Sequence, residues 1–592
     1  MSTDEAVSAP NPSTALATTV VDALVALGLR HLVLSPGSRS APLAYAAAAA
    51  DRAGRLQLHV RVDERAAGFL ALGLARGGAR GGDRDAGPPL VAVVTTSGTA
   101  VANLHPAVLE AHHAGVPLVV LSADRPHELR GSGASQTADA QARMFLPSVR
   151  FSADVPAPTD PRRQAPAWRS VVSRAAAAAR GARGGSPGPV HLDIAFADPL
   201  VPDGPVDAGP SADRRGLTRV VAPAPAAPVL LERGLPTVVL AGDAPDPALG
   251  LAARELAEAA GWPLLAEPGS GARSGPAAVG PYRVLLEAED AQGPLGAAVE
   301  RVVVFGHPTL SRPVARLLAR DDVELVVVSP GGTWSDAGFR AGAVVPAARV
   351  AGPATAAEAE LAGRWARAGK LAREAVDAVL DGGADESGRE LPDDGLSGPW
   401  AARETVAACA ADGAALVVAA SNPVRDVDLA AHPAEVPTTA NRGLAGIDGT
   451  LSTASGVALA RGGPARVLVG DLAFLHDANA LLLGRDEPRP DLTVVLVNDD
   501  GGGIFETLEH ATAVPRDVFE RVVATPHGVD VASLCAAHGV PHTAPATRAQ
   551  ALAALRARPA GLRVVELRVD RSLVRPRVER IAAAVRAAVA AG

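Results

Sequence analysis

Lysine and cysteine are nearly absent from this chain of 592 residues. Lys370 is the single lysine, so arginine must supply almost every cationic side chain, and its planar guanidinium binds carboxylates and phosphates through paired hydrogen bonds. The two cysteines, Cys409 and Cys535, lie far apart in the sequence and form no metal-binding or redox motif. This pattern predicts a reducing compartment, and we expect a cytoplasmic protein.

Aromatic residues, excess positive charge and long apolar runs are also scarce. Aromatic residues make up 3% of the chain, so Ala, Val and Leu must form its cores. The formal net charge is −8, which argues against general nucleic-acid binding. The longest Ala- and Val-rich runs are interrupted before they reach membrane-spanning length, and the acidic N-terminal segment lacks a signal-peptide pattern. We therefore expect neither nucleic acid nor a membrane as a partner.

Apolar, strand-like runs alternate with helical stretches along the whole chain, which is typical of parallel α/β architecture. A Pro- and Ala-rich stretch at 201–235 and an acidic stretch at 381–399 divide the pattern into three blocks. We predict three doubly wound parallel-sheet domains, at 1–200, 215–380 and 395–592. The clearest expected strands are 31–35, 56–62, 90–95, 118–122 and 189–194 in the first block, and 415–419, 466–469 and 493–497 in the third.

Acidic and amide side chains follow two neighbouring strands of the third block. One expected strand ends at Gly470-Asp471, and the next ends in the run Asn498-Asp499-Asp500-Gly501-Gly502-Gly503. The carboxyl ends of parallel strands meet at one edge of a sheet, where open α/β sheets bind ligands. Carboxylates from Asp471 and Asp499 with a backbone carbonyl suit Mg²⁺, which keeps phosphate oxygens as further ligands. The glycines allow a diphosphate to approach the backbone.

Glu64 stands where an alternating strand runs into a helix, within the sequence VRVDERAAGFLALGLAR. Taken alone, it is best explained as an acidic residue in the first turn of a helix, where the helix dipole favours it. The helix that follows is rich in Gly and Ala, which suits tight packing at a domain or subunit contact. A carboxyl group in an apolar site can also share a proton with a ligand, so Glu64 is a candidate for acid–base chemistry.

Several segments together resemble one branch of the thiamine-diphosphate enzymes. In the outer blocks they are SPGSRS (35–40), DERAAGFLALGLA (63–75), TSGT (96–99), SADRP (122–126), ASQT (134–137), SNPVRD (421–426), NRGLAGIDG (441–449), GDLAFLH (470–476) and NDDGGGIF (498–505). The chain is similar to the 2-succinyl-5-enolpyruvyl-6-hydroxy-3-cyclohexene-1-carboxylate synthase family of menaquinone biosynthesis. The resemblance is strong in both outer blocks and weak in the central block.

This resemblance implies a fold, a reaction and a set of cofactors. The fold is the three-domain architecture of thiamine-diphosphate enzymes. The reaction is decarboxylation of 2-oxoglutarate and 1,4-addition of the succinyl carbanion to isochorismate. The cofactors are thiamine diphosphate and Mg²⁺, with Mn²⁺ as an alternative metal. The assembly is a homodimer or homotetramer, in which the first domain of one chain faces the last domain of its partner.

The resemblance also assigns roles to individual residues. Glu64 would exchange a proton with the aminopyrimidine ring of the cofactor, and Ile447 would hold the cofactor in a bent conformation. The other catalytic positions are Arg39, Gln136, Arg425 and Arg442. The substrate-binding positions are Ser38, Arg125, Arg312, Ser421, Ile504 and Phe505. The cofactor-binding positions are Ile447, Gly470, Asp471, Leu472, Ala473, Asp499 and Gly501, of which Asp471, Asp499 and the carbonyl of Gly501 bind the metal.

Several of these assignments leave an alternative open. A one-residue ambiguity in the loop leaves Asn498 as an alternative to Asp499 as metal ligand. Arg312 is explained equally well as a solvated surface residue, because the family often has a Lys-Arg pair where this chain has Ser311-Arg312. Arg425 is expected at the end of a strand-to-loop segment. A glycine-rich segment at 269–275 is a near miss to a dinucleotide fingerprint, and we predict a loop there.

Two other functions use the same features. Another thiamine-dependent 2-oxoacid decarboxylase, or a carboligase like acetohydroxyacid synthase, would share the cofactor residues and differ in its acceptor. An enzyme that uses pyruvate needs no arginine cluster, because pyruvate has no distal carboxylate. A non-enzymatic protein could bind the cofactor on the same fold, but the presence of Glu64 argues against it.

Overall fold

The computed structural model describes residues 10–592 except for 80–88, 207–208, 222, 245 and 383–395. Most of the predicted acidic boundary at 381–399 therefore lies outside the described residues. Contacts between residues divide the chain into two compact units. Unit 1 comprises Met1–Pro223, Ser455–Arg461 and Leu482–Pro488, and unit 2 comprises Ala224–Ala454, Gly462–Leu481 and Arg489–Gly592.

Unit 1 is built on a six-stranded parallel sheet with the order β2-β1-β3-β4-β6-β5. Its inner strands are near-continuous apolar runs; every residue of LVAVVT in β3 is buried, as expected for a parallel sheet covered on both faces. All five strands expected in this block occur. The strands are β1 (Leu29–Leu34), β2 (Gln57–Val60), β3 (Leu90–Thr95), β4 (Leu118–Asp124), β5 (Phe151–Val155) and β6 (Pro189–Ala195).

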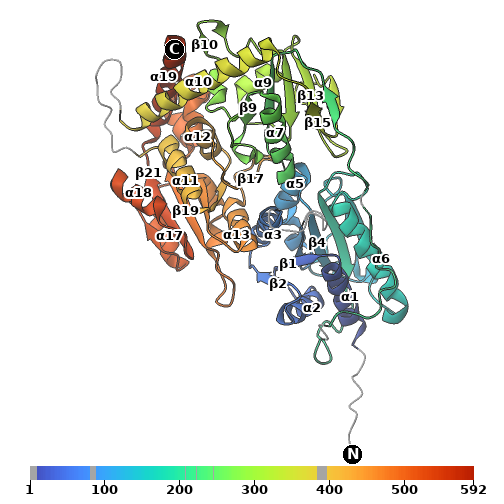
Figure 1. Cartoon of the computed structure of the whole chain (residues 1–592). Helices are drawn as coiled ribbons and strands as arrows, with labels where there is room; N and C mark the ends of the chain where they lie inside the picture. The colour runs from blue at the N-terminus through green and yellow to red at the C-terminus, as the bar shows by residue number, and fades with distance from the viewer. Residues whose placement is uncertain (1–9, 80–88, 207–208, 222, 245, 383–395) are drawn as a thin grey trace, which may run out of the picture. The chain divides into compact units, whose positions relative to one another are not determined.

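Helices cover both faces of this sheet (Figure 1). One face packs against α1 (Pro12–Ala26), α2 (Ala41–Arg52) and α6 (Pro161–Ala179), and the other against α3 (Glu64–Gly78) and α5 (His105–Ala114). Leu32 and Val33, neighbours in β1, belong to the two different clusters, because successive side chains of a strand point to opposite faces.

The glycine-rich helix α3 packs tightly, as its sequence predicts. A Cβ atom at Gly77 would lie 2.8 Å from Cα of Val457, and one at Gly456 would lie 2.3 Å from the carbonyl oxygen of Leu70. Val457 and Gly456 belong to the part of α13 (Thr450–Arg461) that is grouped with unit 1. Any larger residue at these two glycines would push the helices apart.

Unit 2 contains two parallel sheets, one of five strands in the order β14-β13-β12-β8-β9 and one of six in the order β17-β16-β18-β19-β21-β20. The three strands expected in the last block occur as β16, β18 and β19. The five-stranded sheet comprises β8 (Thr237–Ala241), β9 (Leu264–Ala266), β12 (Arg301–Phe305), β13 (Glu324–Val328) and β14 (Ala343–Val345). The six-stranded sheet comprises β16 (Ala415–Val418), β17 (Thr438–Ala440), β18 (Ala465–Gly470), β19 (Leu492–Asn498), β20 (His542–Thr543) and β21 (Leu562–Arg568).

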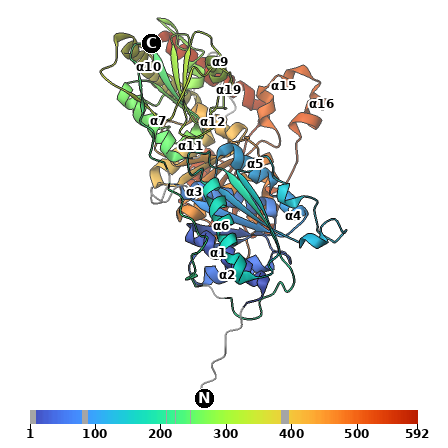
Figure 2. The ribbon, with the colours of Figure 1, turned by 90° about the vertical axis from the view of Figure 1, so that its right-hand side faces the viewer.

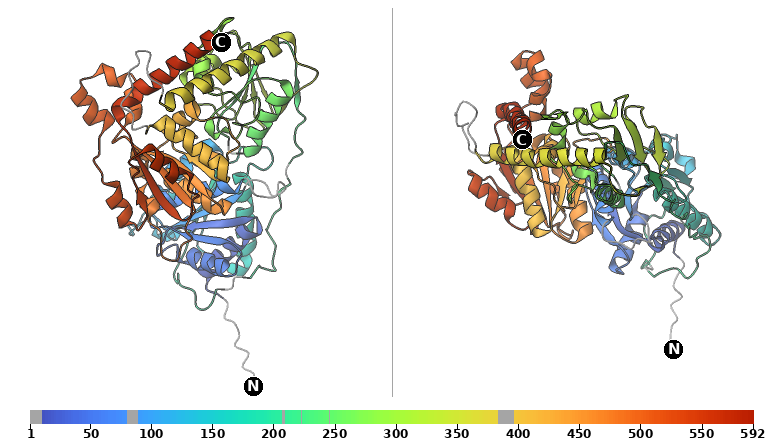
Figure 3. Two further views of the ribbon diagram at one scale, coloured as in Figure 1. Left: turned by 60° about the vertical axis from the view of Figure 1, so that its left-hand side comes forward. Right: turned by 45° about the horizontal axis from the view of Figure 1, so that its top comes forward.

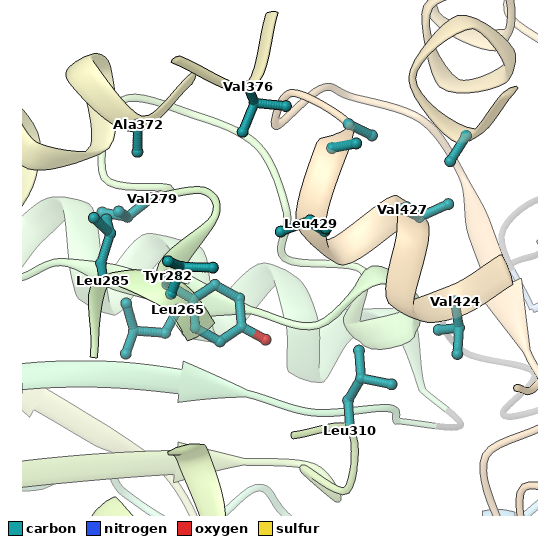
Figure 4. Packing of buried hydrophobic residues seen from close by; sticks show 14 of the residues in the cluster. Leu265, Val279, Tyr282, Leu285, Leu310, Ala372, Val376, Val424, Val427 and Leu429 are labelled. Carbon is teal, nitrogen blue, oxygen red and sulfur yellow. The ribbon is translucent and has the colours of Figure 1, made fainter. Parts of the chain in front are cut away.

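One apolar cluster joins the two sheets of unit 2 (Figure 4). It includes Leu265 in β9, Tyr282 on α8 (Tyr282–Leu285) and Val424 on α12 (Asn422–Ala430). The long helices α10 (Ala356–Leu380) and α19 (Val574–Ala591) lie side by side and contribute to the same cluster (Figure 3). The short helices α15 (His510–Ala513) and α16 (Arg516–Phe519) stand away from the sheets of unit 2 (Figure 2).

Three smaller points complete the fold. The stretch 201–235, predicted as a linker, also contains β7 (Val229–Leu231), which pairs with β15 (Ala348–Val350). Cys409 and Cys535 are buried free thiols. Among the described residues, no helix combines the length and apolar character needed to cross a membrane.

Candidate active site

The six-stranded sheet of unit 2 places cationic and acidic side chains after four adjacent parallel strands. Arg442 follows β17, Arg425 lies in the helix after β16, Asp471 begins the helix after β18, and Asp499 follows β19. The strands run in the same direction, so these residues share the edge at which the strands end. One half of this edge carries arginines and the other half carries carboxyls.

Asp471 forms the centre of the acidic half. It is 3% exposed and starts α14 (Asp471–His476). Its Oδ1 accepts the backbone N–H of Leu472 at 2.6 Å, and its Oδ2 accepts that of Gly501 at 2.9 Å. The ring Nε2 of His527 lies 3.2 Å from the same Oδ2. Burial raises the pKa of Asp471, and these hydrogen bonds offset part of that effect.

Asp499 is a second carboxyl, half-buried, that interacts with the charge of Asp471. Its pKa is raised to about 8, chiefly by burial and then by the negative charge of Asp471, while Arg571 acts in the opposite direction. A buried and a half-buried carboxyl, the first of which disfavours ionisation of the second, form a site that a divalent cation would stabilise. The described residues include no cluster of three His, Cys, Asp or Glu side chains suited to a metal. That is compatible with the predicted set, which is two carboxylates and one carbonyl.

Glycine is required in the loop after β19. Gly501 has φ +139°, and a Cβ atom there would lie 2.4 Å from the carbonyl oxygen of Ala524. A Cβ atom at Gly503 would lie 1.8 Å from Oδ2 of Asp499. The carbonyl of Gly501, the third predicted metal ligand, accepts the N–H of Gly503 at 3.1 Å and has a second lone pair available.

The structure also bears on the ambiguity between Asn498 and Asp499. The side chain of Asn498 donates to Oε1 of Glu566 at 2.7 Å and accepts the N–H of Asp500 at 3.1 Å. Both polar ends of this amide are therefore engaged with other groups, whereas Asp499 lies close enough to Asp471 for the two charges to interact. This arrangement favours Asp499 over Asn498 as the second metal ligand.

Arg442 and Arg425 form the cationic half. Arg442 is 5% exposed; its Nη2 donates to Oγ1 of Thr309 at 2.8 Å, and its Nε has no hydrogen-bond partner within the described residues. Nη1 of Arg425 donates to the carbonyl oxygen of Ser421 at 2.7 Å. The pKa of Arg425 is lowered by burial and by the positive charges of Arg442 and Arg283. Two guanidinium groups held against their mutual repulsion favour an anionic ligand.

The position of Arg425 corrects the sequence-based expectation. It does not end a loop but lies in the first turns of α12, which begins at Asn422. Pro423 near the helix start has a suitable φ and needs no hydrogen-bond donor there, so the helix can begin directly after the strand. Ser421, the residue before the helix, has φ +72°, a conformation that non-glycine residues rarely adopt.

Unit 1 holds a second pair of arginines among the predicted residues. Nη1 of Arg39 donates to the carbonyl oxygen of Phe196 at 2.9 Å, and the pKa of Arg39 is lowered by burial and then by the charge of Arg125. Nε of Arg125 donates to the carbonyl oxygen of Ser135 at 2.8 Å and to Oγ1 of Thr137 at 3.1 Å. Arg125 thereby fixes the loop that carries Gln136, whose φ is +54°.

Glu64 and Ser38 complete the predicted residues of unit 1. Glu64 is half-buried at the first position of α3, and Asp63 caps this helix by accepting the N–H groups of Arg65 and Ala66. Ser38 is exposed, in the turn before α2. Glu64 thus belongs to unit 1, whereas the acidic pair belongs to unit 2.

The remaining predicted residues of unit 2 differ in burial. Ile447, Ile504 and Phe505 are half-buried, as is Leu472, while Ala473 is buried in α14. Gly470 lines a pocket together with Asp499, Asn422 and the start of α11 (Gly398–Asp412).

Arg312 lies on the surface. Its side chain is 71% exposed and pairs with Glu509 at 2.7 Å, at the start of α9 (Arg312–Leu318). The two interpretations of Arg312 that the sequence left open therefore both stand, because an exposed arginine can bind a substrate or only water.

Sequence reasoning missed several residues that support these groups. His527 and Arg571 contact the acidic half of the sheet edge, but neither lies in a recognisable motif. Gln141, 2% exposed, accepts the N–H of Gly98 at 2.8 Å and donates to the carbonyl of Ala123 at 3.0 Å and to Asp193 at 2.7 Å. The only sequence signal for Gln141 is its position shortly after ASQT.

Comparison with known proteins agrees with this geometry. Residues 14–144 match the family model described as thiamine pyrophosphate enzyme, N-terminal TPP binding domain. The chain is 76% identical to a 2-succinyl-5-enolpyruvyl-6-hydroxy-3-cyclohexene-1-carboxylate synthase of Kineococcus radiotolerans, over 98% of this chain and 100% of that protein. The synthase of the same name from a Nocardioides species is 46% identical, over 97% and 98% of the two chains.

A solved structure has the same fold. Benzoylformate decarboxylase from Polynucleobacter necessarius superposes with a TM-score of 0.61 over 94% of this chain and 98% of that chain, at 18% sequence identity. At that identity the likeness concerns the fold alone, which is built from parallel α/β domains. The full-length sequence relatives are more specific, and they show that the chain belongs to the 2-succinyl-5-enolpyruvyl-6-hydroxy-3-cyclohexene-1-carboxylate synthase family.

Proposed function

We propose that the protein catalyses the decarboxylation of 2-oxoglutarate and the 1,4-addition of the succinyl unit to isochorismate, with thiamine diphosphate and Mg²⁺ as cofactors. The observation that carries this proposal is the charge arrangement along the six-stranded sheet of unit 2. Its acidic half, Asp471 and Asp499, suits a metal that binds a diphosphate, and its cationic half, Arg425 and Arg442, suits a substrate carboxylate.

The acidic half would hold the metal and the diphosphate. Asp471, Asp499 and the carbonyl of Gly501 would bind Mg²⁺, with diphosphate oxygens as further ligands. Metal binding would replace the unfavourable interaction of these two carboxyls by attraction to a common cation. Because Mg²⁺ keeps octahedral geometry through water and phosphate oxygens, three protein ligands are sufficient, and Mn²⁺ can take its place in such an oxygen site.

Glu64 would provide the acid–base function. Thiamine diphosphate, when bound, supplies the nucleophilic thiazolium carbon and the electron sink for decarboxylation. Glu64 would hold a proton at the aminopyrimidine ring and exchange it there, and its place at the start of α3 keeps the carboxyl on a rigid element. Ile447 would support the bent conformation of the cofactor from the NRGLAGIDG loop.

The arginines would bind and orient the substrates. Two arginines in unit 2 and two in unit 1, Arg39 and Arg125, match two substrates that each carry more than one carboxylate. Ser421 and Gln136 have strained backbone conformations, which are common where binding residues are held in fixed positions. Ser38, Arg312, Ile504 and Phe505 are further candidate substrate contacts, with Phe505 and Ile504 supplying an apolar wall.

We further propose a homodimer, with the homotetramer as a larger alternative, and a cytoplasmic location. In such a dimer, as the family resemblance implies, Glu64 of one chain would face the metal site of its partner. Exposed apolar side chains beside the predicted residues support a contact with a second copy of the chain. Val62, next to Asp63-Glu64, is 72% exposed, and Leu444, in the NRGLAGIDG loop, is 53% exposed. A light-scattering mass equal to one chain in active samples would refute this assembly.

The direct test is turnover by the purified protein with Mg²⁺ and thiamine diphosphate. We expect release of CO₂ from 2-oxoglutarate and, with isochorismate present, an adduct that carries a succinyl unit by mass spectrometry. Arg442→Lys serves as a matched variant, because lysine keeps the positive charge but cannot bind a carboxylate through two parallel hydrogen bonds. A clear preference for pyruvate over 2-oxoglutarate would instead indicate a different thiamine-dependent carboligase.

A further inference from the structure

Glu267 is a fully buried carboxyl in the central block that the predicted reaction does not use. It follows β9, is 2% exposed, and its own N–H donates to the carbonyl of Ala241 at 2.9 Å. No motif of the sequence marks it. A buried acid needs a compensating set of partners, so its hydrogen bonds show what it holds in place.

Those partners are two consecutive backbone amides. Oε1 of Glu267 accepts the N–H of Thr309 and the N–H of Leu310, both at 2.8 Å. The side chain of Thr309 is in turn the hydrogen-bond acceptor for Nη2 of Arg442, at 2.8 Å. Glu267 is therefore connected to Arg442 through one residue, Thr309.

The same two amides belong to a loop that also supports Arg425. Leu310 is buried in the apolar cluster with Val424 and Val427 of α12, the helix that carries Arg425, and Figure 4 shows Leu310 and Val424 facing one another. The loop ends at Arg312, the first residue of α9. One carboxyl thus holds a short segment that contacts both elements of the cationic half.

The turn that starts at Glu267 also packs against β17, the strand that precedes Arg442. A Cβ atom at Gly269, two residues after Glu267, would lie 3.5 Å from Cβ of Ala440, the last residue of β17. Arg442 follows Ala440 by two residues. The turn that starts at Glu267 therefore packs against the strand that delivers Arg442, and only a small residue fits there, because Oδ1 of Asp243 would be 2.7 Å away.

We propose that Glu267 is a positioning residue for the substrate-binding arginines, in which its carboxyl fixes the Thr309–Leu310 backbone so that Arg442 meets a substrate carboxylate in one orientation. The inference rests on the proposed function and assigns the central block a part in substrate recognition. Without the carboxyl, two buried N–H groups would lack an acceptor, and the loop would have to move to satisfy them.

The protonation of Glu267 indicates which substitution preserves this function. Burial raises the pKa of Glu267 to about 8, and Asp428 raises it further, while the hydrogen bonds from Leu310 and Thr309 and the charge of Arg442 lower it. At neutral pH the carboxyl therefore carries a proton for most of the time. Glutamine has the same shape and retains an acceptor oxygen, so Glu267→Gln should keep the loop in place, whereas Glu267→Leu should not.

The experiment compares four single variants with the wild-type enzyme and adds Arg442→Ala, alone and combined with Glu267→Leu. Glu267→Gln and Glu267→Leu test the carboxyl, and Thr309→Val removes the acceptor of Arg442 without changing Glu267. The matched control is Glu358→Leu, because Glu358 is also fully buried in unit 2 and accepts the N–H of Thr355 at 2.7 Å and Nε1 of Trp262 at 3.0 Å. Each is assayed for kcat, KM, thermal midpoint and thiamine diphosphate affinity, and for binding of glutarate by calorimetry.

We expect Glu267→Gln to stay within about 3-fold of wild type. Glu267→Leu and Thr309→Val should raise KM and the glutarate dissociation constant by about 10- to 100-fold and leave thiamine diphosphate affinity unchanged. Glu358→Leu should lower the thermal midpoint and leave KM unchanged. In an Arg442→Ala background, Glu267→Leu should change KM by less than about 2-fold, because Glu267 affects substrate binding only through Arg442.

The proposal is overturned if Glu267→Leu keeps wild-type glutarate affinity, if its effect adds fully to that of Arg442→Ala, or if Glu358→Leu raises KM equally. A crystal structure of Glu267→Leu that retains the contact between Arg442 and Thr309 would also overturn it. Failure of the proposed function is a separate outcome: the wild-type protein would not turn over 2-oxoglutarate and isochorismate, while the variant structure would still show whether Arg442 has moved.

Discussion

Glu267→Gln should stabilise the protein increasingly as pH rises. The folded-state pKa of Glu267, about 8, lies above its ordinary value of 4.5, so between these values the folded state binds more protons at this group than the unfolded state does. The free energy of unfolding of the wild-type protein therefore falls with rising pH across this window, by up to about 1.4 kcal/mol per pH unit. Glutamine does not titrate, so this residue does not lower the free energy of unfolding of the variant as pH rises.

The size of the effect follows from the width of the window. Over pH 4.5 to 8 the contribution of Glu267 reaches roughly 3–5 kcal/mol, a large part of the stability of an ordinary domain. Above about pH 8 the difference between variant and wild type should level off, because Glu267 is then ionised in both states. The groups that interact with Glu267 are Asp428, Arg442 and Tyr282, and all three remain in the variant.

Denaturant unfolding followed by tryptophan fluorescence gives the measurement. The chain has five tryptophans, of which Trp168 lies in unit 1 and the others, including the buried Trp262 and Trp365, lie in unit 2. Both proteins are therefore studied in a Trp168→Phe background, because two compact units need not unfold together. Curves are recorded without cofactor at pH 5.5, 7.0 and 8.5. A difference between the two proteins that stays constant over this range, or grows toward acid pH, would refute the reasoning.

Three further predictions concern the candidate site. Asp471→Asn should weaken thiamine diphosphate binding in the presence of Mg²⁺ by at least about 100-fold, measured by calorimetry, because it removes a charged metal ligand; unchanged affinity would exclude Asp471 from the metal site. Glu64→Gln should lower kcat by about 100- to 10,000-fold with cofactor affinity within a few-fold, and full activity would remove Glu64 from catalysis. Gln141→Leu leaves the N–H of Gly98 without its acceptor and Asp193 without one donor, so we expect a stability loss of about 1–3 kcal/mol by denaturant unfolding; a loss below about 0.5 kcal/mol would contradict this.

The sheets were predictable because buried parallel strands leave a clear sequence pattern. Strands β3, β4 and β6 are six or seven residues long, mostly apolar and buried along their whole length, and all of them lie within two residues of the expected bounds. The strand β5, FSADV, is half-exposed and includes Ser and Asp, so its composition resembles a loop. β17 and β20 are only three and two residues long, too short for any periodicity to appear.

The residues of the candidate site were also predictable only in part. Asp471, Asp499 and their glycines lie within one short stretch of sequence, so their spacing could be interpreted directly. Glu267 and Gln141 each accept a backbone N–H more than 40 residues away, and nothing in their local sequence indicates which N–H groups they will accept. The positive φ of Ser421 likewise depends on how β16 meets α12, and serine at that position gives no hint of it.

The two halves of the sheet edge share one physical principle. On the acidic side, the charge of Asp471 raises the pKa of Asp499; on the cationic side, the charge of Arg442 lowers the pKa of Arg425. Each pair combines one buried and one half-buried group of like charge, which lowers stability in the absence of a ligand of opposite charge. Contacts with the surrounding fold hold these groups in place. Gly501 and His527 contact Asp471 on the acidic side, and Thr309, held by Glu267, contacts Arg442 on the cationic side. A site organised in this way gains most from a ligand that brings a cation to one half and a carboxylate to the other, which is what a metal diphosphate cofactor and a dicarboxylate substrate together supply.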